Sequence, residues 1–235
     1  MKKAQKPMKI AIIVIAVLAA IALAVGGAVL AYYYLPISYG ETQTHTVGDG
    51  KTLKVGVISD TQLAPNESDG ESYQNYEAHL HTALSQLKEQ QVEMVLFAGD
   101  ICDNASKHAY HTYQTAIRDT WPDEASRPVF LNIMGNHDLW FESDYWSVPP
   151  KHRLFQKQMG TNPYIHMTVN GVHFIGVSPD KTQNKDGYSQ KALDWMDAEI
   201  QKAQETTPKG KPIFVITHHN PQNTSCLLYT SDAAD

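Results

Sequence analysis

The stretch VFLNIMGNHD, residues 129–138, is the part of the sequence that most clearly indicates the fold class. An apolar, β-branched run predicts a buried strand, and a polar motif, Gly135-Asn136-His137-Asp138, follows it directly. Two earlier motifs, Asp60-Thr61-Gln62 and Gly99-Asp100-Ile101-Cys102-Asp103, each follow an apolar run of the same kind. Because open α/β sheets hold ligands at the carboxyl ends of parallel strands, we expect the three loops to meet at one sheet edge.

Strand-like and helix-like segments alternate from residue 53 onward. The predicted strands are residues 53–59, 92–98, 128–134, 164–169, 172–177 and 212–217, and the predicted helices are 73–90, 105–118 and 190–204. The order of the first elements implies parallel strands joined by right-handed crossovers. Asn170-Gly171 suits the type I′ turn of a β-hairpin, and residues 139–150 are predicted to be an irregular aromatic loop. The fold class is therefore α/β.

The strand ends carry oxygen and nitrogen donors of the kinds that bind divalent metals. Asp60 and Asp100 offer anionic oxygens, Asn136 offers a neutral oxygen, and His218 or His219 offers an imidazole nitrogen. Two ions that share a carboxylate clamp a phosphate and lower the pKa of a water molecule between them. The donor set therefore predicts metal-assisted phosphate chemistry.

These motifs resemble, in order and spacing, those of the calcineurin-like metallophosphoesterases. The chain looks like a membrane-anchored, bacterial-type member of that family. The resemblance implies an α/β/β/α sandwich, two divalent ions (manganese, iron or zinc) and hydrolysis of phosphate mono- or diesters. It implies that Asp60 binds one metal, that Asp100 bridges both and that Asn136 binds the second. A histidine after the strand at 212–217 supplies a further ligand, and we favour His218 over His219.

The resemblance also assigns two residues to the leaving group. It implies that His137 contacts the substrate or protonates the departing oxygen, and that Asp103 orients this histidine and fixes its tautomer. One position departs from the family, because Gln62 stands where a histidine metal ligand is usual. An amide oxygen suits harder ions, so Gln62 favours manganese as the metal.

The last ten residues, 226–235, resemble one reading frame of a transposon-based sequencing adapter, with a natural disordered tail as the alternative. A second departure agrees with this, because the closing Gly-His-x-His motif of the family is absent. We therefore expect a metallophosphoesterase domain at 53–225 that is incomplete at its C-terminal end. This chain is accordingly expected to be inactive or weakly active.

The amino terminus contains 22 residues, Ile10–Ala31, without a charged or strongly polar side chain. As a helix they span about 33 Å, enough to cross a bilayer core of about 30 Å. The four lysines before them favour a cytoplasmic amino terminus. Residues 1–35 are thus predicted as the cytoplasmic tip and single-pass cell-membrane anchor, 36–52 as a stalk, and the catalytic domain as extracellular. A cleaved signal peptide is the alternative.

The composition limits the class of partner. The chain has 235 residues, 42% of them hydrophobic, and a net charge of −6. No cluster of lysine and arginine follows residue 10, so we expect a small phosphate ester as the substrate and no long nucleic acid as a ligand. Two other functions stay open: a non-catalytic surface binding protein on the same fold, for which Gln62 is the best support, and an extracellular nucleotidase or nuclease.

Overall fold

The computed structural model describes residues 5–34, 39–67, 70–139, 148–181 and 187–220. The chain divides into two compact units, Met1–Ile37 and Ser38–Asp235. The first unit is helix α1 (Gln5–Tyr34), which contains the apolar segment Ile10–Ala31. This segment is long and apolar enough to span a membrane, as a signal sequence also would be.

Within the described residues, the second unit contains two β-sheets. The first sheet has the order β2-β3-β4, all parallel, with β2 (Val55–Ile58), β3 (Met94–Ala98) and β4 (Val129–Ile133). The second has the order β1-β5-β6-β7, with β1 (Glu41–His45), β5 (Tyr164–Val169), β6 (Val172–Val177) and β7 (Ile213–Thr217). Only β5 and β6 pair antiparallel among these strands. Their turn, Asn170-Gly171, has positive φ at both residues (51° and 74°), as the predicted type I′ turn requires.

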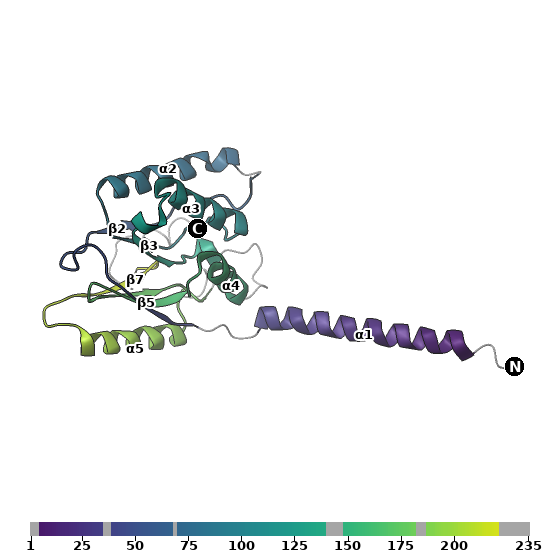
Figure 1. Ribbon diagram of the computed structural model, residues 1–235. Coiled ribbons are helices and arrows are strands. Elements are labelled where there is room, and N and C mark those ends of the chain that lie inside the picture. Colours follow the sequence, from purple (N-terminus) through teal and green to yellow (C-terminus); the bar gives the residue numbers. More distant parts are fainter. Residues whose placement is uncertain (1–4, 35–38, 68–69, 140–147, 182–186, 221–235) are drawn as a thin grey trace, which may run out of the picture. The chain divides into compact units, whose positions relative to one another are not determined.

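The two sheets pack face to face, and helices cover their outer faces (Figure 1). Met94 and Leu96 of β3 join one buried cluster with Ile165 and Met167 of β5. The outward-facing Phe97 packs instead with α2 (Gly70–Glu89), α3 (Lys107–Thr120) and α4 (Val148–Met159). Helix α5 (Gln190–Thr206) covers the second sheet. The chain is therefore the α/β/β/α sandwich that the sequence predicts.

Helix α4 is absent from the sequence-based prediction. Its first residues, Val148-Pro149-Pro150, fall within the irregular loop predicted at 139–150, and proline in the interior of a helix breaks it. Proline is however favourable in the first turn of a helix, where its missing N–H has no intrahelical partner to lose. The middle of that predicted loop, 140–147, lies outside the described residues. The short helix η2 (Glu124–Ser126) was also not predicted.

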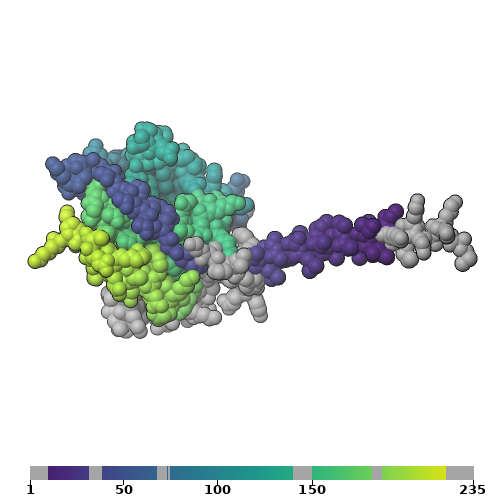
Figure 2. Space-filling view, turned by 60° about the horizontal axis from the view of Figure 1, so that its bottom comes forward, coloured from purple at the N-terminus to yellow at the C-terminus, as the bar shows by residue number. Residues whose placement is uncertain are grey.

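The predicted stalk, residues 36–52, needs correction, because it contains β1. This strand pairs with β5 in the register Glu41↔Ile165 to His45↔Val169. Just before it, the ring of Tyr39 stacks on Tyr164 with 4.7 Å between the centroids. Figure 2 shows the segment around β1, in indigo, along the surface of the domain. The polar sequence of β1 suits an edge strand. Because β1 has no apolar residues, it lacks the apolar–polar alternation by which a strand is predicted.

His152 of α4 connects this start of the domain to the second sheet. Its Nε2 donates to the carbonyl oxygen of Pro179 (2.9 Å), and its Nδ1 accepts from the hydroxyl of Tyr39 (3.0 Å). Both contacts suit the neutral imidazole. Burial lowers the pKa of His152 from 6.5 to about 4, although the Pro179 carbonyl and Asp180 act in the opposite direction.

We expect acid to destabilise the domain through His152. The folded protein resists protonation of this ring, so the stabilisation is complete above pH 6.5 and is lost as the pH falls toward 4. Between pH 7 and pH 5 the loss in unfolding free energy is about 2 kcal/mol. Urea unfolding of the detergent-solubilised chain at both pH values should show a smaller loss for His152→Gln. Parallel pH profiles for the two proteins would contradict this role.

Candidate metal centre

The loops that follow β2 and β3 run side by side. The backbone N–H of Asp60 donates to the carbonyl oxygen of Gly99 (3.0 Å), and that of Gln62 donates to the carbonyl oxygen of Asp100 (3.0 Å). Asp60, Gln62 and Asp100 have positive φ angles of 58°, 43° and 54°. Such conformations are uncommon for residues other than glycine and cluster at functional sites. The structure therefore brings the first two predicted motifs together, and Gln62 joins them through its backbone.

Two glycines allow the loop after β3 to lie close to the loop after β4 and to the end of β7. A Cβ atom on Gly99 would lie 2.6 Å from Nδ1 of His218, and φ at Gly99 is 94°. A Cβ atom on Gly135 would lie 2.1 Å from Oδ1 of Asp100. Any larger residue at either position would push a predicted metal ligand out of place.

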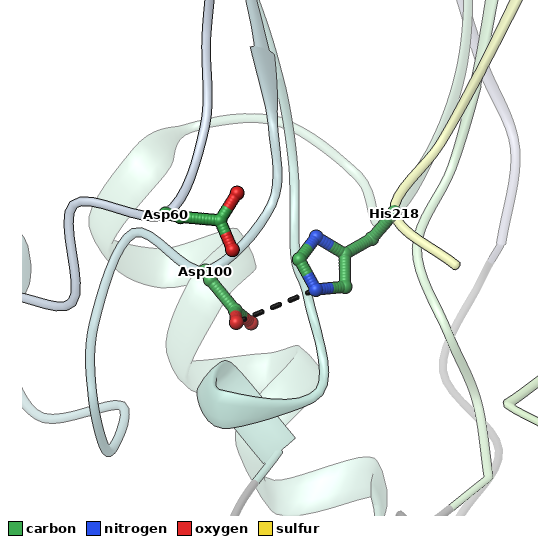
Figure 3. Close-up of side chains that lie close together, drawn as sticks. All are labelled: Asp60, Asp100 and His218. Carbon is green, nitrogen blue, oxygen red and sulfur yellow. Dashed lines mark ion pairs between the residues drawn. The ribbon is translucent and has the colours of Figure 1, made fainter. Parts of the chain in front are cut away.

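Three predicted ligands converge in the space that the glycines leave. One ligand atom each from Asp60, Asp100 and His218 lies within 4.8 Å of the others, and Figure 3 shows the side chains pointing toward one another. They come from the carboxyl ends of β2, β3 and β7. Asn136, after β4, joins them through a 2.9 Å contact between its Oδ1 and Nε2 of His218. Two carboxylates, an amide oxygen and an imidazole nitrogen are a donor set that fits a divalent cation.

The orientation of His218 is fixed by its other ring nitrogen. Nδ1 donates to the carbonyl oxygen of Ala98 (2.9 Å), which leaves Nε2 facing Oδ2 of Asp100 at 3.3 Å. Burial lowers the pKa of His218, but the hydrogen bond and charge of Asp100 outweigh it and raise the pKa to about 9. Conversely, His218 holds the pKa of Asp100 below its usual value although burial opposes this. The site thus favours a negative carboxylate next to a positive charge.

A second pair lies beside these ligands. Nδ1 of His137 is 2.9 Å from Oδ1 of Asp103, as the resemblance implies. His137 begins the short helix η3 (His137–Leu139), and its backbone N–H donates to Oδ1 of Asp100 (2.9 Å). The same carboxylate therefore lies against the imidazole of His218 and holds the backbone of His137. This arrangement places an oriented histidine at the edge of the ligand cluster.

Asp138, the last residue of the Gly-Asn-His-Asp motif, has a structural role beside the ligand cluster. Its side chain is fully buried and accepts the backbone N–H groups of Gly135 (2.8 Å), Cys102 (3.0 Å) and Ile101 (3.2 Å). Burial raises its pKa to about 6, while these N–H groups act in the opposite direction. One side chain therefore ties the loop after β3 to the loop after β4. Its position in the Gly-Asn-His-Asp motif was the signal that could have found it.

Tyr188 fixes the end of β7 and was also missed. Its hydroxyl oxygen accepts the backbone N–H groups of His218 (3.1 Å) and His219 (3.4 Å). The ring of His219 lies against Gly187, with 2.4 Å between its Nδ1 and a Cβ placed on that glycine, and His219 is not one of the three residues whose ligand atoms converge. His218 is accordingly the histidine that the structure places at the cluster. No sequence motif marks Tyr188.

Comparison with known proteins identifies the family of this chain. The calcineurin-like phosphoesterase family model matches residues 53–235. The chain belongs to the calcineurin-like phosphoesterase family. This confirms the resemblance found from the motifs and makes the chain a metal-dependent phosphoesterase by family. A crystal structure of a dimetal phosphatase from Danio rerio is similar, with 14% identity, a TM-score of 0.47 and coverage of 71% of this chain and 69% of that chain. A search of curated proteins returned no match.

Proposed function

We propose that this calcineurin-like phosphoesterase hydrolyses small phosphate mono- or diesters with a dinuclear metal centre, on the outer side of a membrane. The observation that carries the proposal is the convergence of Asp60, Asp100 and His218 within 4.8 Å from three separate strand ends. The apolar segment Ile10–Ala31 and the lysines that precede it support the anchored topology.

The proposal assigns a set of residues to the metals. Asp60 and Gln62 hold one ion, Asp100 is shared, and Asn136 and His218 hold the second. Bound divalent ions supply positive charge for the phosphoryl oxygens and lower the pKa of water. Manganese is favoured over iron and zinc because Gln62 offers an amide oxygen instead of an imidazole nitrogen.

His137 is the proposed proton donor. Hydrolysis consumes one water: its oxygen forms a new bond to phosphorus, the bond to the leaving oxygen breaks, and that oxygen takes a proton. Asp103 holds Nδ1 of His137 at 2.9 Å, and the proposal assigns the proton transfer to the other ring nitrogen, Nε2. The attacking water releases a proton to the solvent, the solvent returns one proton to His137, and the products are an alcohol and phosphate, or an alcohol and a phosphate monoester if the substrate is a diester.

The detergent-solubilised chain is expected to bind Mn²⁺ in calorimetric titrations and to hydrolyse 4-nitrophenyl phosphate or bis(4-nitrophenyl) phosphate when the ion is present. Metal binding is the primary readout, because we expect only weak turnover from this chain. A chelator should abolish the turnover, and added Mn²⁺ should restore it more fully than Zn²⁺. Turnover that survives chelation, or absence of binding to Mn²⁺, Fe²⁺ and Zn²⁺ alike, would refute the proposal.

A further inference from the structure

A tyrosine from α2 reaches the histidine–aspartate pair. The hydroxyl of Tyr73 donates to Oδ2 of Asp103, whose Oδ1 is 2.9 Å from Nδ1 of His137. The three side chains come from α2, from the loop after β3 and from η3, so they are brought together only by the fold. No motif of the sequence points to Tyr73.

The carboxylate of Asp103 needs this second contact to be fixed. Its side chain is 30% exposed, and that of His137 is 20% exposed, so packing alone does not hold either group. A carboxylate held at one oxygen turns easily, because its terminal torsion has broad minima. The Tyr73 hydroxyl occupies the other oxygen and thereby sets the plane in which Asp103 meets the imidazole.

Tyr73 lies beside a cavity and is partly exposed. Its ring lines a cavity of about 250 Å³ together with Leu63, Glu77, His108 and other side chains. Tyr73 is accordingly only partly enclosed by its neighbours, and its hydroxyl donates to Asp103 beside open space. Tyr76, one turn further along α2, is 39% exposed, and its ring is tilted by 44° to that of Tyr73 with 5.7 Å between the centroids.

We infer that Tyr73 is a positioning residue that acts through Asp103 to present His137 to the leaving group. The inference rests on the proposed function, in which Nε2 of His137 protonates the leaving oxygen. With both oxygens of Asp103 engaged, Nδ1 of His137 keeps its proton and Nε2 stays directed away from the carboxylate. Tyr73 therefore matters most for substrates whose leaving oxygen needs that proton.

The test compares leaving groups. Tyr73→Phe removes only the hydroxyl and is expected to lower kcat about 10-fold for an alkyl phosphate, with KM nearly unchanged. For a 4-nitrophenyl ester, whose leaving oxygen is stable without a proton, we expect a change within about twofold. Tyr76→Phe makes the same chemical change one turn away and should leave both substrates unaffected. An equal loss on both esters, or no loss on either, would overturn the inference.

A double-mutant cycle isolates the pathway. In an Asp103→Asn background, Tyr73→Phe should cost nothing further, because the group through which it acts is already altered. Additive losses would show that Tyr73 acts by another route.

A readout on the metal-free protein separates this inference from the proposed function. The proposed function fails if the parent chain binds none of Mn²⁺, Fe²⁺ and Zn²⁺, and where the parent chain hydrolyses neither ester, long-range ¹H–¹⁵N spectra of labelled histidine decide the role of Tyr73. At a pH where imidazoles are neutral, His137 should carry its proton on Nδ1 in the parent chain and in Tyr76→Phe, but show mixed tautomers in Tyr73→Phe. An unchanged tautomer in Tyr73→Phe would refute the inference.

Discussion

Replacing Asp100 with asparagine is expected to lower the affinity for Mn²⁺ and to reduce turnover at least about 1,000-fold, equivalent to about 4 kcal/mol. Asp100 is 2% exposed, its Oδ2 lies 3.3 Å from Nε2 of His218, and its Oδ1 accepts the backbone N–H of His137. Asparagine keeps the shape and an accepting oxygen, so the fold should survive. What it removes is the negative charge at the centre of the cluster.

A metal-free measurement checks the same change. Because Asp100 is the main group that raises the pKa of His218 to about 9, the substitution should return that pKa toward its ordinary value in NMR titrations. Asp119→Asn, an exposed aspartate near the end of α3, is the matched control and should change neither metal affinity nor the pKa. Unaltered Mn²⁺ binding by Asp100→Asn would rule out the proposed centre.

Replacing Asp138 with alanine is expected to lower the free energy of unfolding by about 3–5 kcal/mol. The change leaves the buried N–H groups of Gly135, Ile101 and Cys102 without their acceptor, and each such group costs about 1–3 kcal/mol. Asp138→Asn keeps one accepting oxygen and should lose less. Urea unfolding followed by circular dichroism measures both variants.

The control for Asp138 is an aspartate with one exposed contact of the same kind. Asp123 accepts the backbone N–H of Ala125 at the start of η2, and Asp123→Ala should cost at most about 1 kcal/mol. A similar cost for both alanine variants would mean that the three buried contacts of Asp138 contribute little to stability.

The parts of the fold that the sequence predicts are those with a local signal. The hairpin strands 164–169 and 172–177 have their predicted bounds, because Asn170-Gly171 fixes the turn and with it the register. The helix α5 begins at its predicted residue because Ser189 caps it. Strand β1 lacks such a signal, since Glu-Thr-Gln-Thr-His is polar throughout and its pairing with β5 is a tertiary contact.

The residues of the candidate site likewise include some that sequence motifs predict and some that no motif marks. The order of motifs along the chain was enough to predict that Asp60, Asp100 and Asn136 lie at one sheet edge with a histidine, and the structure brings them there; their role as ligands stays a prediction. Tyr73 and Tyr188 could not be found, because each contacts the site across about 30 residues of chain and belongs to no motif. Such contacts depend on tertiary packing.

The positions of Tyr39 and β1 determine where the chain should be truncated to give a water-soluble enzyme without the apolar segment. The family match starts at residue 53, so a gene trimmed to that boundary would strip the strand that borders β5. The main-chain N–H and C=O groups of β5 would then be unpaired, and their pairing with other polypeptides would promote aggregation. A protease site or purification tag belongs upstream of Tyr39, where it spares the stacked rings of Tyr39 and Tyr164.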